Sequence, residues 1–451
     1  MENLNNIKDK NIYGNQNIWR ISYPIFLSLL AQNVINVTDT AFLGRVGEVE
    51  LGASAMGGLY YICAFTIAFG FSIGSQIVIG RRNGERNYTA VGPVVVQGII
   101  FLFCLAAICF AGSKLFAGNL MRLLVSSDEI WNATMEFLDW RIIGFFFSFF
   151  NVMFRALFVG ITRTKVLTLN AAIMALTNVI LDYSLIFGHA GLPEMGVKGA
   201  AIASVIAEAV SVVFFIIYTY STVDRKKYGL DKFRSFDFGL LKQVLSISIF
   251  TMLQYFVSMS TFFLFFVVVE KLGKQQLAIA NIVRSVYIVM FIPVNSLSTA
   301  TNTIVSNLMG AGKNLSVIPA IRRISLISLG VMVIFSSILA LFPHTVLSIY
   351  TNDPTLIQSS VPSLYVIAVA ALFSSTANVV FNGVSGTGNT RSALAIELGV
   401  LVLYTSFMLV IGLVLRQPVH ICFMSEFVYF SFLLVGSILY LRFASWEKKK
   451  I

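Results

Sequence analysis

The sequence predicts an all-α polytopic membrane protein, with twelve transmembrane helices in two six-helix lobes. Hydrophobic residues make up 57% of the 451 positions and charged residues only 12%, about half the charged fraction of soluble domains. Apolar segments of about 20 residues, the length that crosses a bilayer core, recur along the whole chain. Basic residues lie mainly between alternate segments, as expected for a multi-pass protein with a defined orientation.

The apolar segments are separated by short polar turns and define the predicted spans in order. Residues 1–17 are polar and contain no apolar core followed by a cleavage site, so we expect the first span to serve as its own insertion signal. The twelve predicted spans cover residues 18–43, 52–80, 91–112, 133–160, 166–188, 197–221, 240–269, 276–308, 318–342, 358–385, 393–415 and 419–442.

The basic residues orient these spans. With both termini in the cytoplasm, 22 Lys and Arg residues fall in inner segments, seven in outer loops and three within spans. This asymmetry follows the positive-inside rule. We therefore predict a multi-pass protein of the plasma (cytoplasmic) membrane with both termini cytoplasmic. Because topology accounts for the net charge of +11, that charge does not indicate nucleic-acid binding.

A polar interval at the middle of the chain divides it into two predicted domains. Residues 1–221 would form an N-lobe, 222–239 a cytoplasmic linker and 240–451 a C-lobe. Turn residues recur at an offset of 226 residues between the halves, and six spans per half insert both copies the same way up. This pattern predicts a parallel internal repeat, with the substrate path between the lobes. The pairs at this offset include Gly47 and Gly273, Gly84 and Gly310, Gly160 and Gly386, and Thr164 and Thr390.

The first span carries polar side chains that lipid cannot satisfy. Gln32, Asn36 and Asp39 are spaced by four and three residues, which places them on one helix face. Interhelical hydrogen bonding is one explanation for the two amides, whereas a carboxylate inside a span is a functional candidate. Pro24, in the same span, removes a backbone hydrogen bond and permits a bend.

The fifth span contains a second carboxylate, Asp182, four residues after Asn178. Two carboxylates that face one low-dielectric cavity can hold a proton at neutral pH, because burial and like charge both oppose the second negative charge. At the 226-residue offset, Asp39 falls on Phe265 and Asp182 falls on Met408. The acidic pair is therefore not duplicated, which favours a dedicated ion site over a structural role.

These residues resemble the multidrug and toxic compound extrusion (MATE) family of the MOP superfamily, over about residues 15–443. The likeness rests on the order and spacing of several segments within a twelve-helix frame. The segments are Val37-Thr-Asp-Thr-Ala-Phe-Leu-Gly44, Gly84, Asn178-x-x-x-Asp182, Gly199-Ala-Ala-Ile-Ala-Ser204 and Gly386-Thr-Gly-Asn-Thr-Arg391. The resemblance implies antiport, in which organic and often cationic compounds leave the cell as protons or sodium ions enter.

Within that family, the chain is similar to the proton-coupled prokaryotic, DNA-damage-inducible-F-like branch. The resemblance implies a cation-coupling site at Asp39, Asn178, Asp182 and Ser204, although threonine is more usual at the last position. It also implies that protonation is accompanied by a bend of the first helix, here at Pro24.

The sodium-coupled branch instead has acidic residues in the C-lobe, on the seventh and tenth helices. This sequence has Gln254 or Ser258 and Ser374 at the corresponding places. That departure favours protons over sodium ions as the coupling ion.

Other ionisable or polar groups lie within C-lobe spans. Arg284, Glu397 and Glu426 should each find an internal partner. Structural pairing is the simpler explanation for these groups, and a C-lobe ion pair or a substrate contact is the alternative, for which Gln254 is a further candidate. A competing hypothesis is a flippase for lipid-linked or other amphipathic precursors of the same superfamily. It requires a basic cavity, for which Arg141, Arg155 and Arg284 are the candidates.

The remaining patterns do not indicate an enzyme. Gly70-Phe-Ser-Ile-Gly74 matches a hydrolase motif but lies inside an apolar span, where its glycines are better explained by helix packing. The three histidines share no spacing typical of a metal site. We therefore expect no cofactor or metal. The expected partners are small organic molecules and the lipid bilayer, without nucleic acid, and the chain is expected to be a monomer.

Overall fold

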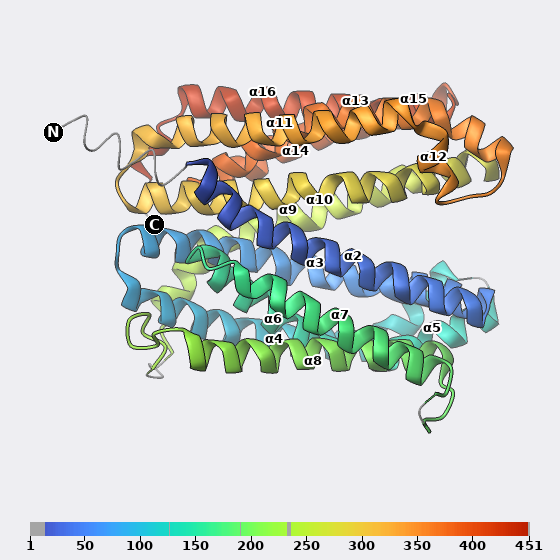
Figure 1. Ribbon diagram of the computed structural model, residues 1–451, viewed down its shortest axis with the longest axis horizontal. Helices are drawn as coiled ribbons and strands as arrows, with labels where there is room; N and C mark the ends of the chain where they lie inside the picture. The colour runs from blue at the N-terminus through green and yellow to red at the C-terminus, as the bar shows by residue number, and fades with distance from the viewer. Residues whose placement is uncertain (1–13, 126, 190, 232–235, 450–451) are drawn as a thin grey trace. The chain divides into compact units, whose positions relative to one another are not determined.

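The computed structural model describes residues 14–125, 127–189, 191–231 and 236–449, and within these residues every regular element is a helix (Figure 1). Residues 232–235 of the predicted linker and most of the predicted N-terminal segment lie outside the described residues. The helices of the first half are α2 (Asn15–Val46), α3 (Glu48–Gly84), α4 (Val91–Leu124), α5 (Asp128–Arg141), α6 (Gly144–Gly160), α7 (Lys165–Ile186) and α8 (Gly196–Thr222).

The second half repeats the pattern of long helices with short additions. Its helices are α9 (Phe238–Glu270), α10 (Lys274–Gly310), α11 (Val317–Leu341), α12 (Pro343–Ser348), α13 (Pro354–Gly386), α14 (Thr390–Leu409), α15 (Val419–Cys422) and α16 (Ser425–Phe443). A π-helical turn, Val410–Val414, extends α14. Before α13, the carboxylate of Asp353 accepts the backbone N–H groups of Thr355 and Leu356, and the bonds from Thr355 hold the pKa of Asp353 below its usual value.

The described residues contain eleven helices that are long and apolar enough to cross a membrane, or twelve if α5 and α6 count as one bent span. The prediction of twelve spans is therefore confirmed, but the fourth, 133–160, is bent by 53° rather than straight. Near Ile142 and Ile143, backbone N–H groups bond to carbonyls three residues back, and this tighter turn interrupts the α-helical ladder. The bend needs no proline.

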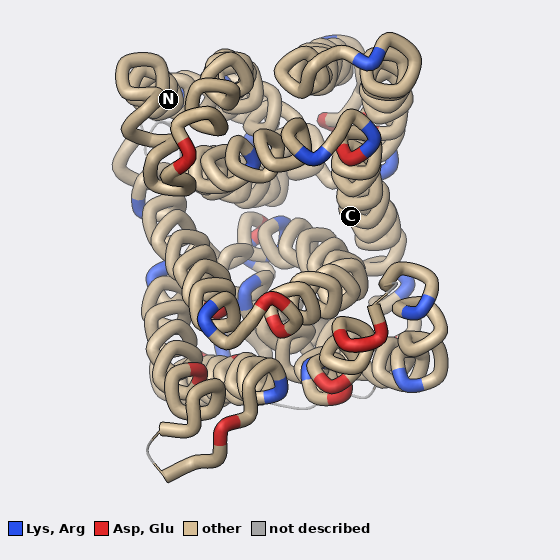
Figure 2. The backbone as a smooth tube through the Cα atoms, turned by 90° about the vertical axis from the view of Figure 1, so that its right-hand side faces the viewer, with Lys and Arg blue, Asp and Glu red and all other residues tan. Residues whose placement is uncertain are grey.

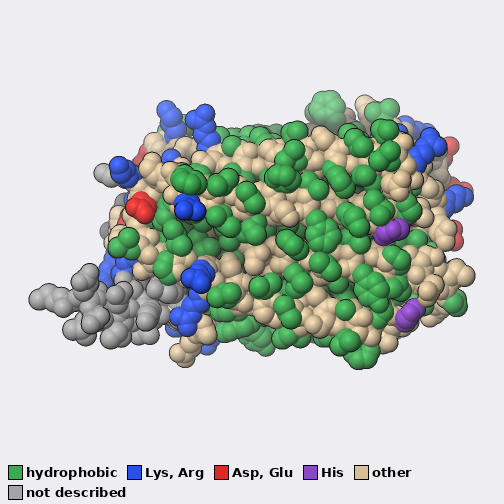
Figure 3. All heavy atoms as spheres, turned by 90° about the horizontal axis from the view of Figure 1, so that it is seen from above, with side chains coloured by type: hydrophobic (Ala, Val, Ile, Leu, Met, Phe, Trp, Pro, Cys, Tyr) green, Lys and Arg blue, Asp and Glu red, His purple; other side chains and the backbone are tan. Residues whose placement is uncertain are grey.

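The long helices have the surface of membrane spans. Figure 3 shows one face, on which hydrophobic side chains cover the middle and Lys and Arg lie towards the two ends. In Figure 2, which views the chain along the helices, charged residues are concentrated at turns and helix ends. Large apolar side chains such as Phe103, Ile108 and Leu176 are more than half exposed within their spans, as expected where lipid covers them.

The chain packs as two compact units. The first unit is Leu27–Met252, and the second is Leu253–Ile451 together with Met1–Phe26. These units differ from the predicted lobes at two helices, because α2 and α9 each contribute to both units. The boundary in α2 follows Pro24 by two residues.

Glycines allow close helix packing inside the first unit. A Cβ on Gly70 would lie 2.5 Å from the Cα of Met252, and a Cβ on Gly74 would lie 2.2 Å from the Oγ of Ser248. The predicted packing role of this glycine pair is therefore confirmed, and a hydrolase role for the segment has no strand-to-turn geometry to support it. The tight packing places α3 directly against the start of α9.

Candidate functional site

Two carboxylates from different helices meet inside the first unit. Asp39 on α2 and Asp182 on α7 lie against each other, and Asn178, one turn earlier on α7, lies beside Asp182. Asp182 and Asn178 are 0% and 1% exposed, and Asp39 is half-buried. The structure thus brings together three of the residues that the sequence singles out.

The hydrogen bonding of this pair is incomplete. Neither carboxylate oxygen of Asp182, and neither polar atom of the Asn178 amide, has a hydrogen-bond partner among the described residues. Ionised carboxylates can only accept hydrogen bonds, so two of them in contact bond to each other only when one carries a proton. The arrangement can therefore store a proton.

The other residues predicted around this pair are less directly involved. Ser204 is half-buried on α8, and within the described residues no hydrogen bond joins it to either carboxylate. Gln32 and Asn36 are exposed on α2, and the backbone carbonyl of Asn36 accepts a bond from the Thr40 hydroxyl at 2.8 Å. Pro24 is buried within a continuous α2. The proposed roles of these four residues stay predictions.

A buried ion pair, not predicted from the sequence, lies in the same unit. The guanidinium of Arg141 on α5 binds both carboxylate oxygens of Glu208 on α8, with Nη2 to Oε1 at 2.7 Å and Nη1 to Oε2 at 3.0 Å. Their side chains are 13% and 14% exposed. Glu208 is a carboxylate inside the predicted span 197–221, and such a residue is a functional candidate by the same rule that singles out Asp39; applying it here would have found Glu208.

An aromatic residue on α3 completes this cluster. The Arg141 guanidinium lies 3.5 Å from the ring centroid of Tyr61. The Tyr61 hydroxyl donates to the Oγ of Ser148 at 2.7 Å and lies 3.2 Å from Oε2 of Glu208. Asn151 donates to the backbone carbonyl of Glu208 at 3.0 Å. The ion pair is therefore held by side chains from four helices, α3, α5, α6 and α8.

The second unit holds one buried carboxylate, Glu397, and one half-buried carboxylate, Glu426. Glu397 on α14 is 2% exposed and accepts hydrogen bonds from the hydroxyls of Ser258 at 2.7 Å and Tyr429 at 2.6 Å. Glu426 on α16 accepts one from the hydroxyl of Tyr287 at 3.1 Å. Hydroxyl donors, rather than cations, are the partners that the structure gives these two groups.

These contacts bear on two expectations for the C-lobe. The guanidinium of Arg284 lies 5.0 Å from the ring centroid of Phe266, and within the described residues it forms no ion pair with Glu397 or Glu426. The three side chains therefore have different neighbours, and a substrate or ion-pair role for them stays a prediction. In addition, α14 places the Glu397 carboxylate beside Ser258, so an acidic group does reach the seventh span.

The other polar positions weighed for the C-lobe have ordinary surroundings. Ser374 donates to the backbone carbonyl of Ala371 at 2.9 Å. The Oε1 atom of Gln254 has no donor among the described residues, and its side chain is half-buried. Neither contact indicates which ligand, if any, Ser374 or Gln254 would bind.

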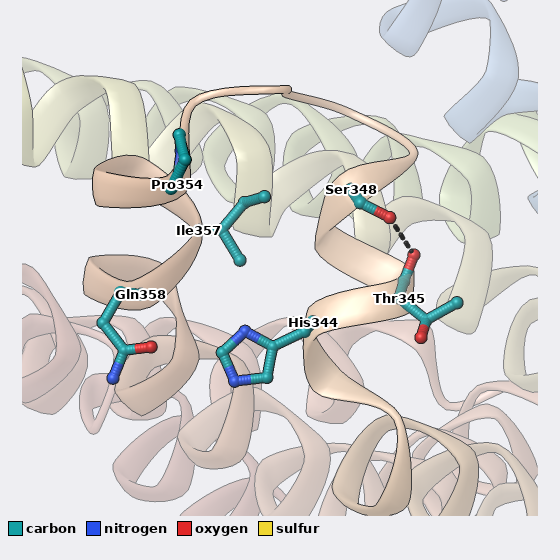
Figure 4. Close-up of a pocket in the computed structure, with 6 residues that line it drawn as sticks. All are labelled: His344, Thr345, Ser348, Pro354, Ile357 and Gln358. Carbon is teal, nitrogen blue, oxygen red and sulfur yellow. Dashed lines mark hydrogen bonds between the residues drawn. The ribbon is translucent and has the colours of Figure 1, made fainter.

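An open hollow of about 470 Å³ lies elsewhere in the second unit, between α12 and the start of α13 (Figure 4). A hydrogen bond of 2.8 Å from Ser348 Oγ to the Thr345 carbonyl lies along one side of it. The residues that line the hollow are His344, Thr345, Ser348, Pro354, Ile357 and Gln358.

In the described part of the chain no three His, Cys, Asp or Glu residues are grouped so that they could hold a metal ion.

Apolar helical spans that contain buried carboxylates are typical of multi-pass membrane transporters, and comparisons with known proteins identify the family of this chain. A sequence model of the family described as MatE matches residues 24–184 and again 251–412. The chain belongs to this family. The two matches cover corresponding stretches of the two halves, as the predicted duplication requires.

Relatives of the chain carry related names. It is 25% identical over 385 residues to a protein of Thermotoga maritima named probable multidrug resistance protein NorM, covering 84% of this chain and 81% of the relative. A protein of the same name from Agrobacterium fabrum is 25% identical over 360 residues, covering 78% and 76%.

Solved structures of the family share the fold. An outward-facing multidrug resistance MATE family transporter of the MOP superfamily superposes with a TM-score of 0.87 at 18% identity, covering 98% of this chain and 99% of that one. A eukaryotic MATE transporter gives 0.84 at 17% identity, with 96% of each chain covered. The predicted fold class is confirmed.

Proposed function

We propose that this protein is a proton-coupled antiporter that exports organic, often cationic amphipathic compounds by alternating access. The observation that carries the proposal is the contact between Asp39 and Asp182 inside the first unit. Two negative charges at this contact would repel each other, so the pair is suited to sharing one proton. The multidrug resistance names of the relatives support the substrate class.

The proposed cycle couples the charge of this pair to the shape of α2. A proton that enters the pair neutralises it, and the helix then bends near Pro24, where one backbone hydrogen bond is missing. In this proposed cycle, the bend closes a substrate cavity of the N-lobe and releases the substrate outward. Loss of the proton to the cytoplasm resets the pair for the next substrate.

The energy of one proton is of the right size for this cycle. A proton that crosses 100 mV and one pH unit supplies roughly 2.3 and 1.4 kcal/mol, respectively. Reversal of a two-state equilibrium from 1:99 to 99:1 takes about 5.5 kcal/mol. One proton therefore biases the two states strongly, and two protons can reverse them.

The test uses purified protein in lipid vesicles, with ethidium as the transported cation and separately imposed proton and sodium gradients. We expect proton-driven transport by the wild type, loss of it in Asp39→Asn, and normal transport in the control Asp139→Asn, whose carboxylate forms an exposed ion pair with Lys114. Wild-type transport by Asp39→Asn would contradict the proposal, and transport driven only by sodium would replace the proton with sodium.

The flippase hypothesis receives less support from the same contacts. A pyrophosphate head group needs accessible positive charge, but Arg141 is neutralised by Glu208. Arg155 and Arg284 lie over the rings of Phe69 and Phe266. The buried carboxylates would also repel an anionic ligand.

A further inference from the structure

Three turns on the predicted inner side of the first unit are strongly basic. They are residues 81–90 between α3 and α4, 161–165 between α6 and α7, and 222–231 after α8. Together they carry eight basic and three acidic residues, a net charge of +5. The positive-inside rule explains why basic residues lie on this side of the membrane. It does not explain where their side chains lie relative to one another.

The three turns meet around two tyrosines. The rings of Tyr88 and Tyr228 lie 5.7 Å apart in an edge-to-face arrangement, and the backbone N–H of Gly92 donates to the carbonyl of Tyr228 at 2.7 Å. The Lys227 ammonium lies 4.3 Å from the ring centroid of Tyr88 and 5.4 Å from that of Tyr228. The Arg163 guanidinium lies 5.9 Å from the Tyr228 centroid. Cations from two separate turns are therefore held beside the same ring.

The cations of this group have no acidic partner. Arg163, Arg225 and Lys227, which we call the basic cluster, are exposed, and within the described residues none of them forms an ion pair. The carboxylate of Asp224 accepts the backbone N–H of Lys227 at 3.0 Å, and Glu85 pairs with a different arginine. Neighbouring like charges without a counterion attract an anionic ligand.

An exposed apolar stripe on α8 leads to the basic cluster. Val213, Ile217 and Tyr220 are spaced by four and three residues, so they lie on one helix face, and each is more than half exposed. The Arg225 guanidinium lies 4.4 Å from the ring centroid of Tyr220, at the end of this stripe. Tyrosine and arginine at the end of a lipid-exposed face are typical of the headgroup level of a membrane.

We propose that the basic cluster binds the phosphate of an anionic phospholipid whose acyl chain lies along the α8 stripe. Guanidinium and ammonium groups hold phosphate through charge-assisted hydrogen bonds. A lipid is the occupant that uses both features, because a soluble phosphate or a nucleic acid would contact the cations and leave the apolar stripe unused. The inference is independent of the proposed proton coupling.

The test measures where a lipid lies on the full-length protein in phosphatidylcholine vesicles. A minor share of the lipid is phosphatidylglycerol with a photoreactive diazirine on its acyl chain, and the labelled peptides are mapped by mass spectrometry. Labelled phosphatidylcholine in a parallel sample gives the background. We expect phosphatidylglycerol to be enriched over this background at Val213 and Ile217, but not at the exposed Leu326 and Val333 on α11. Equal labelling by the two lipids at the α8 stripe would overturn the proposal.

Removal of charge should act locally. Replacing all three residues of the basic cluster by glutamine should lower the enrichment at the α8 stripe by about tenfold or more, because each basic residue near an anionic membrane surface contributes roughly fivefold in affinity. The control removes the same charge from exposed residues of the second unit and should leave the enrichment unchanged. Equal losses in the two variants would show that only the total charge matters. The control substitutions are Arg322→Gln, Arg391→Gln and Lys449→Gln.

A substitution that keeps every charge tests the arrangement itself. Gly229 has φ of +64°, and a Cβ there would lie 2.3 Å from the carbonyl oxygen of Thr89. Gly229→Ala should therefore displace the turn that carries Arg225 and Lys227 and reduce the enrichment. Gly312→Ala, with a similar φ of +70° and open surroundings, should not. Wild-type enrichment in Gly229→Ala would contradict a site built by this turn.

A soluble competitor distinguishes a lipid from a free phosphate compound. An excess of glycerol 3-phosphate, which has the phosphate but no acyl chain, should leave the labelling of the α8 stripe unchanged. Displacement of the lipid by this compound would overturn the proposed occupant in favour of a soluble phosphate ligand. Transport is not measured in any of these experiments, so their failure would leave the proposed function untouched.

Discussion

The buried carboxylates of the first unit are satisfied to very different degrees. Glu208 receives two hydrogen bonds from Arg141, whereas Asp182, which is fully buried, receives none from the described residues. An unsatisfied buried polar group lowers stability, and natural proteins keep such groups mainly where function uses them. Asp182 therefore combines a structural cost with the capacity to exchange a proton.

Replacing this carboxylate should separate stability from function. We expect Asp182→Asn to abolish proton-driven ethidium transport, while the thermal unfolding midpoint in detergent stays equal to that of the wild type or rises, since the amide carries no charge. Transport and unfolding are measured on the same preparation. A marked fall in the unfolding midpoint would indicate a structural role for the carboxylate instead.

Gly144 offers a second test among single residues. Gly144→Ala should force the Arg141–Glu208 pair apart, because the added Cβ would lie within 2.6 Å of both side chains, and overpacking of this kind costs about 1–3 kcal/mol. The matched control is Gly112→Ala in α4, where the added Cβ meets nothing within 4 Å. Thermal unfolding should show a loss for the first variant only, and equal behaviour of the two would contradict this packing.

Among the turns, the segment after α8 is held against the start of α4. The backbone N–H of Gly92 donates to the carbonyl of Tyr228 at 2.7 Å, and the Tyr228 side chain is 3% exposed. Lys227 lies 4.3 Å from the ring centroid of Tyr88. This part of the predicted linker is therefore a docked element of the first unit.

The docking depends on a glycine with a left-handed backbone. Gly229 has φ of +64°, and a Cβ there would lie 2.3 Å from the carbonyl oxygen of Thr89. Gly229→Ala should lower the unfolding free energy by more than the roughly 1 kcal/mol expected from backbone strain alone. Gly312→Ala isolates that strain, because Gly312 has φ of +70° and open space around it. Equal losses in the two variants would show that the close approach to Thr89 is unimportant.

For the chain as a whole, the orientation in the membrane is still a prediction from the basic residues. In a variant without its four cysteines, Lys271→Cys should react with a membrane-impermeant maleimide in intact cells. Lys313→Cys should react only after the membrane is opened, because it belongs to an inner turn in the predicted topology. The reverse pattern would invert the orientation and place both termini outside.

The sequence was sufficient to predict the spans and to single out Asp39 and Asp182, because span length and the cost of an in-span carboxylate follow from the absence of water in a bilayer. That these two residues share one site was implied by the family resemblance. It could not predict the bend of the fourth span, which depends on a tight turn at Ile142 and Ile143 without proline. The partner of Arg141 was also out of reach, since Glu208 lies 67 residues away and only packing selects it.

The Arg141–Glu208 pair also restricts how segments of this chain can be exchanged with those of a relative. A chimera that replaces α5 but keeps α8 retains Glu208 without Arg141, and the reciprocal exchange retains Arg141 without Glu208. Position 144 is part of the same block, because a Cβ there would displace the ends of both side chains. Functional hybrids should therefore have junctions that transfer the block from α5 to α8 intact.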